Sequence, residues 1–132
     1  MLKEKIKITS LKVHKDARGL LAKIFDYTSL KGKNIHDIYV TITPPGQKRA
    51  DHYHKKTTEW FCAIKGKGIM KFKAIDTNEE LEVEIDAEDM ALVEVPPKIN
   101  HRVLSEGDEE LILMAFGNQP YKKDDTDTYV LE

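Results

Sequence analysis

Hydrophobic and polar residues alternate along much of the chain, in short runs separated by polar or Gly/Pro turns. In residues 69–74, Met70 and Phe72 alternate with lysines, and residues 81–85 repeat the pattern with glutamates. Because successive side chains of a strand point to opposite faces, a period of two predicts strands. The polar turn at 76–79 therefore predicts a hairpin whose lysine face lies opposite its glutamate face.

Further strands are expected at even spacing: 20–25, 36–43, 58–65, 90–95, 101–106 and 110–116. Helix signals are scarce, and one short helical turn near residues 27–31 is the most that the pattern supports. Many short, evenly spaced strands predict an all-β sandwich or barrel. We expect the apolar side chains of these runs to form the core, among them Met70, Phe72, Met90, Met114 and Phe116.

The composition is that of an ordinary globular chain, and the 132 residues suit one domain over 1–132. A net charge of -2 argues against a nucleic-acid or anionic-membrane partner. No apolar run approaches the roughly 20 residues that a membrane span needs. The first ten residues lack the apolar segment of a secretory signal, and a lone cysteine, Cys62, fits a reducing compartment. We therefore expect a cytoplasmic protein.

Three histidines and a glutamate stand out as candidates for chemistry. His52 and His54 are two residues apart, so on a strand both project from one face. Glu59 follows a short turn onto the next strand, on a face shared with apolar residues, and His101 opens a strand after a Pro-Pro turn. A barrel is the simplest closed sheet in which these four side chains could meet.

This set of side chains suits one divalent first-row ion, with zinc as the first candidate and manganese, iron or nickel as others. An uncompensated carboxylate on a core-facing strand would be costly, and a bound ion removes that cost. The alternative is that the histidines form hydrogen bonds inside a polar lumen without metal. His14 and His36 lie outside the pattern, and we expect them at the surface.

The spacing around these residues resembles the first motif of the cupin superfamily: glycine, five residues, His-x-His, four residues, glutamate, six residues, glycine. Gly46 and Gly66 are its two glycines. The second motif, which contains His101, departs from the pattern at three positions: Met90 and Lys98 in place of glycines, and Ser105 in place of the terminal asparagine. The resemblance implies a small antiparallel β-barrel, the double-stranded β-helix or jelly roll.

The resemblance extends over residues 14–130 to cupins that act on nucleotide-linked keto-sugars. It includes the segments 16–19 (DARG) and 38–46 (IYVTITPPG), Arg49 and the closing Asp-Thr-Tyr at 127–129. The chain is most similar to the C-terminal cupin domain of bifunctional capsular-polysaccharide enzymes. More distantly, it resembles dTDP-4-dehydrorhamnose 3,5-epimerases and dTDP-sugar 3,4-ketoisomerases. This implies an epimerase or isomerase of a nucleotide-linked 4-keto-sugar in surface-polysaccharide biosynthesis, acting by proton abstraction next to the ketone.

The arginines suggest how the nucleotide-sugar substrate would be held. Only three of the 21 basic residues are arginines, and all lie in or beside a motif. The planar fork of an arginine suits bidentate contact with a diphosphate, so we expect Arg18 and Arg49 to bind substrate. The alternative is that Arg18 pairs with Asp16 in a turn and that Arg49 is a solvated edge residue. Arg102 should point away from the site.

For catalysis, His52 and His54 are the candidate bases and Tyr129, in the closing motif, is the candidate acid. Tyr121 is a further candidate, whereas Tyr53 lies between the two histidines and should face away. If all three histidines bind metal, none remains free as a base, and the sequence leaves this question open.

Trp60 lies on the strand face opposite Glu59 and needs cover, either from a second layer or from another copy. With unpaired strand edges, this predicts a homodimer. Two other functions remain open: a metal-dependent cupin oxygenase, and a non-catalytic cupin that senses a sugar or another effector. Arg18 and Arg49 discriminate between them, because phosphate recognition requires that both point into the barrel mouth.

Overall fold

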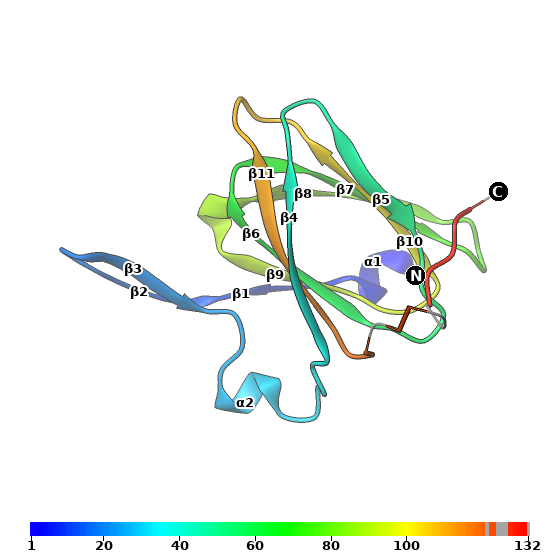
Figure 1. Cartoon of the computed structure of the whole chain (residues 1–132), viewed down its shortest axis with the longest axis horizontal. Helices are drawn as coiled ribbons and strands as arrows, with labels where there is room; N and C mark the ends of the chain where they lie inside the picture. Colours follow the sequence, from blue (N-terminus) through cyan, green and yellow to red (C-terminus); the bar gives the residue numbers. More distant parts are fainter. Residues whose placement is uncertain (121, 124–126, 132) are drawn as a thin grey trace.

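The computed structural model describes residues 1–120, 122–123 and 127–131. Two antiparallel sheets face each other, and a separate hairpin projects to one side (Figure 1). The larger sheet has the strand order β1 (Lys7–Ser10), β9 (Ala91–Val95), β6 (Glu59–Lys65), β11 (Leu111–Gly117) and β4 (Asp37–Thr43). The smaller sheet has the order β5 (Lys48–His52), β10 (Ile99–Ser105), β7 (Lys67–Ala74) and β8 (Glu80–Asp86).

The remaining elements are short. Strands β2 (Lys12–Asp16) and β3 (Gly19–Lys23) form the projecting hairpin. The helices are α1 (Leu2–Lys5), α2 (Tyr27–Leu30) and the 3-10 helix η1 (Ala87–Asp89). Asp26 caps α2, because its carboxylate accepts hydrogen bonds from the amides of Thr28 and Ser29. No helix in the described part of the chain is long and apolar enough to cross a membrane.

The all-β prediction is confirmed, but the expected closed barrel is not observed. Strand pairing joins the strands within each sheet and does not close the two sheets into one ring. The architecture is a β-sandwich of the jelly-roll kind. The predicted strands and the helical turn are present with bounds shifted by at most two residues, and β7 and β8 form the predicted hairpin with Lys71 opposite Glu82.

The core fills the space between the sheets. Met70 and Phe72 of β7 lie inside, as predicted from the alternation, and face apolar residues of β11 such as Leu113. Phe116 is buried, as expected of a core residue, and Met114 is half-buried against the same cluster. Both belong to a second apolar cluster on the outer face of the larger sheet and not to the cluster between the sheets. Met90 is half-buried and belongs to neither cluster.

The second cluster is covered by the chain's own residues 11–35. Phe25 lies edge-on against both Trp60 and Phe116, with ring centroids 5.9 Å and 5.1 Å apart. The indole nitrogen of Trp60 donates to Glu94 at 2.8 Å. The cover that Trp60 needs is therefore a second layer of the same chain, so Trp60 supplies no argument for a dimer.

Two departures from the cupin motif fall where the backbone has a positive φ. Met90 has φ +46° and Lys98 has φ +69°, in the left-handed region that favours glycine. The motif glycine Gly66 has φ +81°, and a Cβ atom there would lie 2.3 Å from the carbonyl oxygen of Glu110. Gly66 therefore has no sterically acceptable replacement, whereas Met90 and Lys98 hold strained backbone.

A candidate metal centre beside a small pocket

The four motif side chains converge between the two sheets. His52 ends β5 and His101 lies in β10 of the smaller sheet, whereas Glu59 begins β6 of the larger sheet. His54 lies in the loop after β5. One candidate ligand atom from each residue lies within 4.8 Å of those from the other three. The structure thus brings together all four residues that the sequence predicted as metal ligands.

A β-bulge aims His52 at this site. Ala50 and Asp51 both have φ +68°, and the pairing of β5 with β10 shifts register next to His52. The carboxylate of Asp51 accepts hydrogen bonds from Asn100 at 3.1 Å and from Nη2 of Arg102 at 2.9 Å. Arg102 is therefore engaged with the bulge, in agreement with the expectation that it points away from the site.

Glu59 is the centre of the hydrogen bonding. Its carboxylate is 4% exposed, with Oε1 2.7 Å from Nε2 of His54 and 3.3 Å from Nε2 of His101. Oε2 accepts a hydrogen bond of 2.7 Å from the hydroxyl of Tyr39. Burial would raise the pKa of Glu59, but the His54 hydrogen bond, the histidine charges and Tyr39 outweigh it, so the pKa lies below its usual range.

The three histidines differ in their electrostatics. Burial lowers the pKa of His101 to about 4, and burial together with the neighbouring His54 lowers that of His52. Burial also acts to lower the pKa of His54, but the hydrogen bond and charge of Glu59 and the contact with Asp127 raise it overall. At neutral pH, His52 and His101 are thus neutral, as metal ligation or a general base requires.

The residues fit a divalent ion. His101 is 1% exposed, and its ring is poorly satisfied by the described residues: Nε2 lies 3.3 Å from Oε1 of Glu59 without the geometry of a hydrogen bond, and Nδ1 has no hydrogen-bond partner. A buried imidazole that is satisfied so poorly is costly, and a metal ion would satisfy it. Three imidazoles and a carboxylate are a common donor set for zinc and related ions. The geometry is therefore that of a site able to hold such an ion.

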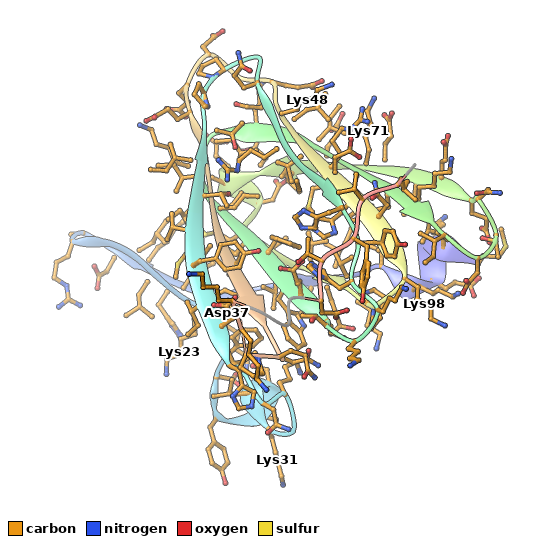
Figure 2. The ribbon with its side chains drawn as sticks, turned by 45° about the vertical axis from the view of Figure 1, so that its right-hand side comes forward. Lys23, Lys31, Asp37, Lys48, Lys71 and Lys98 are labelled. Carbon is orange, nitrogen blue, oxygen red and sulfur yellow. The ribbon has the colours of Figure 1, made fainter. Side chains whose placement is uncertain are left out.

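A pocket of about 200 Å³ is lined by three of the four side chains, His52, His54 and Glu59, whereas His101 does not line it. Tyr39 and Asp37 of β4 line it, together with Thr57 from the loop before β6 and residues near the C-terminal end, Gly117, Gln119, Pro120, Asp127 and Thr128. Figure 2 labels Asp37 at the start of β4. Asp37 and Tyr39 were not predicted from the sequence as site residues. Their positions two apart in the predicted strand 36–43 place both on one face, and this spacing could have indicated that they lie together.

The predicted substrate-binding arginines are not assembled here within one chain. Arg18 lies in the turn of the projecting β2–β3 hairpin, where its guanidinium pairs with Asp16 at 2.6 Å and its side chain is 90% exposed. Arg49 is exposed on β5, close enough to Tyr39 for its charge to act on the pKa of that hydroxyl. The alternative pairing of Arg18 with Asp16 is the one observed.

The predicted acid Tyr129 lies beside the pocket residues but does not line the pocket itself. Its ring stacks on Tyr53, with centroids 5.5 Å apart. Tyr53 is likewise absent from the pocket lining, in agreement with the expectation that it faces away from the histidines. Tyr121 lies outside the described residues. The catalytic assignment of Tyr129 thus stays a prediction, and His14 and His36 are exposed as expected.

Residues 14–129 match the family described as the polysaccharide biosynthesis C-terminal domain. The chain belongs to this family. The matched residues of this polysaccharide biosynthesis C-terminal domain begin in β2 and end at Tyr129, and so include the candidate metal ligands, the pocket and the hairpin.

A curated relative, UDP-2-acetamido-2,6-beta-L-arabino-hexul-4-ose reductase of Pseudomonas aeruginosa, is 29% identical over 117 residues, covering 89% of this chain and 30% of the relative. The capsular polysaccharide assembling protein CapF of Staphylococcus aureus has a TM-score of 0.71 at 24% identity, over 92% of this chain and 34% of CapF. A dTDP sugar isomerase of Desulfovibrio desulfuricans has a TM-score of 0.86 at 14% identity, covering 98% and 85%. The chain thus spans about a third of the first two proteins, and the structural likenesses establish the fold.

Proposed function

We propose that this polysaccharide biosynthesis C-terminal domain is a metal-binding epimerase or isomerase that acts on a nucleotide-linked 4-keto-sugar. The convergence of His52, His54, Glu59 and His101 beside an open pocket carries the proposal. The relatives support the substrate class, because one is named for a UDP-linked hexulose with its ketone at carbon 4 and another for a dTDP-sugar. The shared core of the two sheets supports a single domain over residues 1–132.

The chemistry would begin with removal of a proton from the carbon next to the ketone. A bound divalent ion, zinc being the first candidate, would act as a Lewis acid at the ketone oxygen. His52 is the better base of the two candidates, because it is neutral at pH 7 and accepts no hydrogen bond from a described residue. In this assignment His54, Glu59 and His101 hold the ion, and His52 remains free to act as the base.

Tyr39 joins the proposed site residues, because its hydroxyl donates a hydrogen bond that fixes the orientation of the Glu59 carboxylate. Burial and the charge of Glu59 raise the pKa of its hydroxyl, so it remains protonated and donates to the carboxylate. Return of the proton to the sugar requires an acid, and Tyr129 keeps that assignment as a prediction. Its present stacking on Tyr53 means that it would have to turn toward the pocket.

The nucleotide diphosphate would be bound by Arg49, whose position on β5 lies near Tyr39. Arg18 could contribute only from a second copy, because the hairpin that carries it projects away from its own sandwich (Figure 1). The Arg18 assignment therefore depends on the proposed homodimer. A cytoplasmic location and the absence of nucleic-acid and membrane partners remain predictions.

Two surfaces support a homodimer. The outer face of edge strand β4 presents Ile38, Val40 and Ile42, which are 61%, 54% and 50% exposed. The projecting hairpin presents Leu20 and Leu21, and a two-stranded hairpin is marginally stable without packing partners. Apolar surface of this extent is typical of contacts between copies.

Isotope exchange tests the proposed reaction. UDP- and dTDP-linked 4-keto-6-deoxysugars are incubated with the protein in deuterated water, and NMR follows the hydrogens beside the ketone. We expect exchange that His52→Ala slows by roughly 10²–10⁴-fold. Arg49→Lys should weaken substrate binding instead, because it keeps the charge but loses the bidentate fork. If neither sugar exchanges or raises the melting temperature, the proposed function is wrong.

A further inference from the structure

The C-terminal segment is tied to the loop that carries His54. The carboxylate of Asp127 accepts four hydrogen bonds from this loop: the amides of Lys55 at 3.0 Å, Lys56 at 2.7 Å and Thr57 at 2.9 Å, and the Thr57 hydroxyl at 2.9 Å. These donors outweigh burial and hold the pKa of the Asp127 carboxyl below its usual range. The carboxylate thus fixes Asp127 against residues 55–57.

The same residue contacts His54 through its backbone. The carbonyl oxygen of Asp127 lies within hydrogen-bond reach of Nδ1 of His54. Because a carbonyl oxygen can only accept, the hydrogen must be on Nδ1. By the same reasoning Nε2 donates to the Glu59 carboxylate 2.7 Å away, so the metal-free ring carries both hydrogens, and an ion would take the place of the one on Nε2.

A second set of contacts holds the segment after Asp127 in place. Tyr53 and Tyr129 exchange two backbone hydrogen bonds of 2.9 Å, and their rings stack. The ammonium group of Lys55 lies 4.2 Å from the centroid of the Tyr129 ring. Residues 127–129 are thus anchored on both sides of His54, at Tyr53 and at residues 55–57.

We propose that Asp127 is a positioning residue, whose carboxylate anchors the C-terminal segment so that its own carbonyl holds a hydrogen on Nδ1 of His54 and directs Nε2 at the metal centre. Carbonyl partners of metal-binding histidines act in this way, and their loss typically costs 10–100-fold in metal affinity. The metal affinity rests on the proposed function, whereas the hydrogen bond at Nδ1 of His54 is a property of the metal-free chain.

The carboxylate is the group to change, because a side-chain substitution cannot remove the carbonyl directly. Asp127→Ala removes the acceptor for four donors and should release the carbonyl from His54. Asp127→Asn keeps one acceptor oxygen and should have a smaller effect. Thr57→Val is the matched control, because it removes one of the four hydrogen bonds and leaves the three amide contacts in place.

The first measurement is the ¹H–¹⁵N NMR spectrum of the imidazoles in metal-free protein, which detects a hydrogen-bonded Nδ1–H directly. We expect this signal for His54 in the wild type and in Thr57→Val, and its loss in Asp127→Ala. The second measurement is the affinity for Co²⁺ by absorption and for Zn²⁺ by competition. We expect Asp127→Ala to weaken both by about 10–100-fold.

The outcomes separate the two proposals. If Asp127→Ala keeps both the Nδ1–H signal and the metal affinity of the wild type, the positioning role is overturned. If the wild type binds neither ion but its Nδ1–H signal is lost in Asp127→Ala, the metal-dependent function fails and the positioning of His54 stands. Should Asp127→Ala not fold, Asp127→Asn decides by the same two measurements, with unchanged values counting against the proposal.

Discussion

The hydroxyl of Tyr39 donates a 2.7 Å hydrogen bond to Glu59, from strand β4 to strand β6 across the intervening strand β11. This bond occupies Oε2 of the carboxylate and leaves Oε1 facing His54 and His101. A buried carboxylate with each oxygen directed in this way has a fixed orientation. Tyr39 therefore prepares Glu59 as a ligand although it does not itself belong to the ligand set.

Tyr39→Phe tests this relationship. The substitution leaves a buried carboxylate oxygen without its donor, at a cost of about 1–3 kcal/mol in the free energy of unfolding. We expect that loss in urea unfolding of metal-free protein, together with weaker Zn²⁺ binding. Tyr27→Phe is the control, because Tyr27 is fully exposed on α2, and it should change neither quantity. Equal values for the two variants would show that the Tyr39 hydroxyl does not hold Glu59.

The purified protein should carry close to one divalent ion per chain, measured by elemental analysis. His101→Ala should lose that ion, because it removes a ligand that has no other hydrogen-bond partner among the described residues. The exposed His36 provides the control, and His36→Ala should retain the metal content of the wild type. A folded wild type that takes up no ion after reconstitution would count against the site.

Metal-free protein should lose stability on acidification. The pKa of His101 is about 4 in the folded state against 6.5 in a free side chain. Its contribution to the free energy of unfolding, roughly 3 kcal/mol, is therefore fully present above about pH 6.5 and is lost as the pH falls toward 4. His52, whose pKa is also lowered, acts in the same direction.

The Glu59–His54 pair contributes in both directions: His54 opposes the acid loss, whereas Glu59 adds to it. The raised pKa of His54 gives stability below about pH 6.5 that is lost as the pH rises, and the lowered pKa of Glu59 gives stability above its free value. Urea unfolding with chelator present, at several pH values, should show a shallower acid loss in His101→Ala than in the wild type. Parallel curves for the two proteins would contradict the assignment.

Relief of backbone strain should stabilise the protein at Lys98. This residue has φ +69° and an exposed side chain in the turn before β10, labelled in Figure 2. A left-handed conformation costs a non-glycine residue about 1–2 kcal/mol, so we expect Lys98→Gly to raise the free energy of unfolding by about 1 kcal/mol. Lys98→Ala removes the same side chain but keeps the strain, and it should leave stability nearly unchanged. A loss of stability in Lys98→Gly would show that the turn is not strained.

Light scattering at micromolar concentration should give a dimer of the 15.1 kDa chain. Val40→Lys places a charge in the middle of the exposed apolar face of β4 and should shift the protein toward monomer. Lys71→Glu changes an exposed charge on the other sheet and should not affect the association. A wild-type monomer would exclude both the dimer and a contribution of Arg18 to a neighbouring site.

The alternation of residues predicted most strands, and motif spacing predicted the four side chains that meet at the candidate metal centre. Both signals are local, because each depends on the period of two of a strand. The side chains that cover Trp60 and Phe116 were not predictable in this way, since a contact between residues 11–35 and the outer face of the larger sheet leaves no signal in a local alternation. The position of Arg18 relative to the pocket was not predictable, because a motif fixes its sequence neighbours and not the direction of a projecting hairpin.

His52 and His101 belong to one sheet and Glu59 to the other, and no strand pair among the described residues joins the two sheets. An ion held by Glu59 and His101, together with His54, would add direct bonds between two layers that otherwise adhere mainly through apolar contact. The distance between the two sheets would then be fixed at the end that carries the candidate metal centre, whereas at the opposite end it could still vary. Substitutions by larger or smaller core side chains would change the distance between the sheets. They should therefore alter the coordination geometry of the ion before they alter the fold.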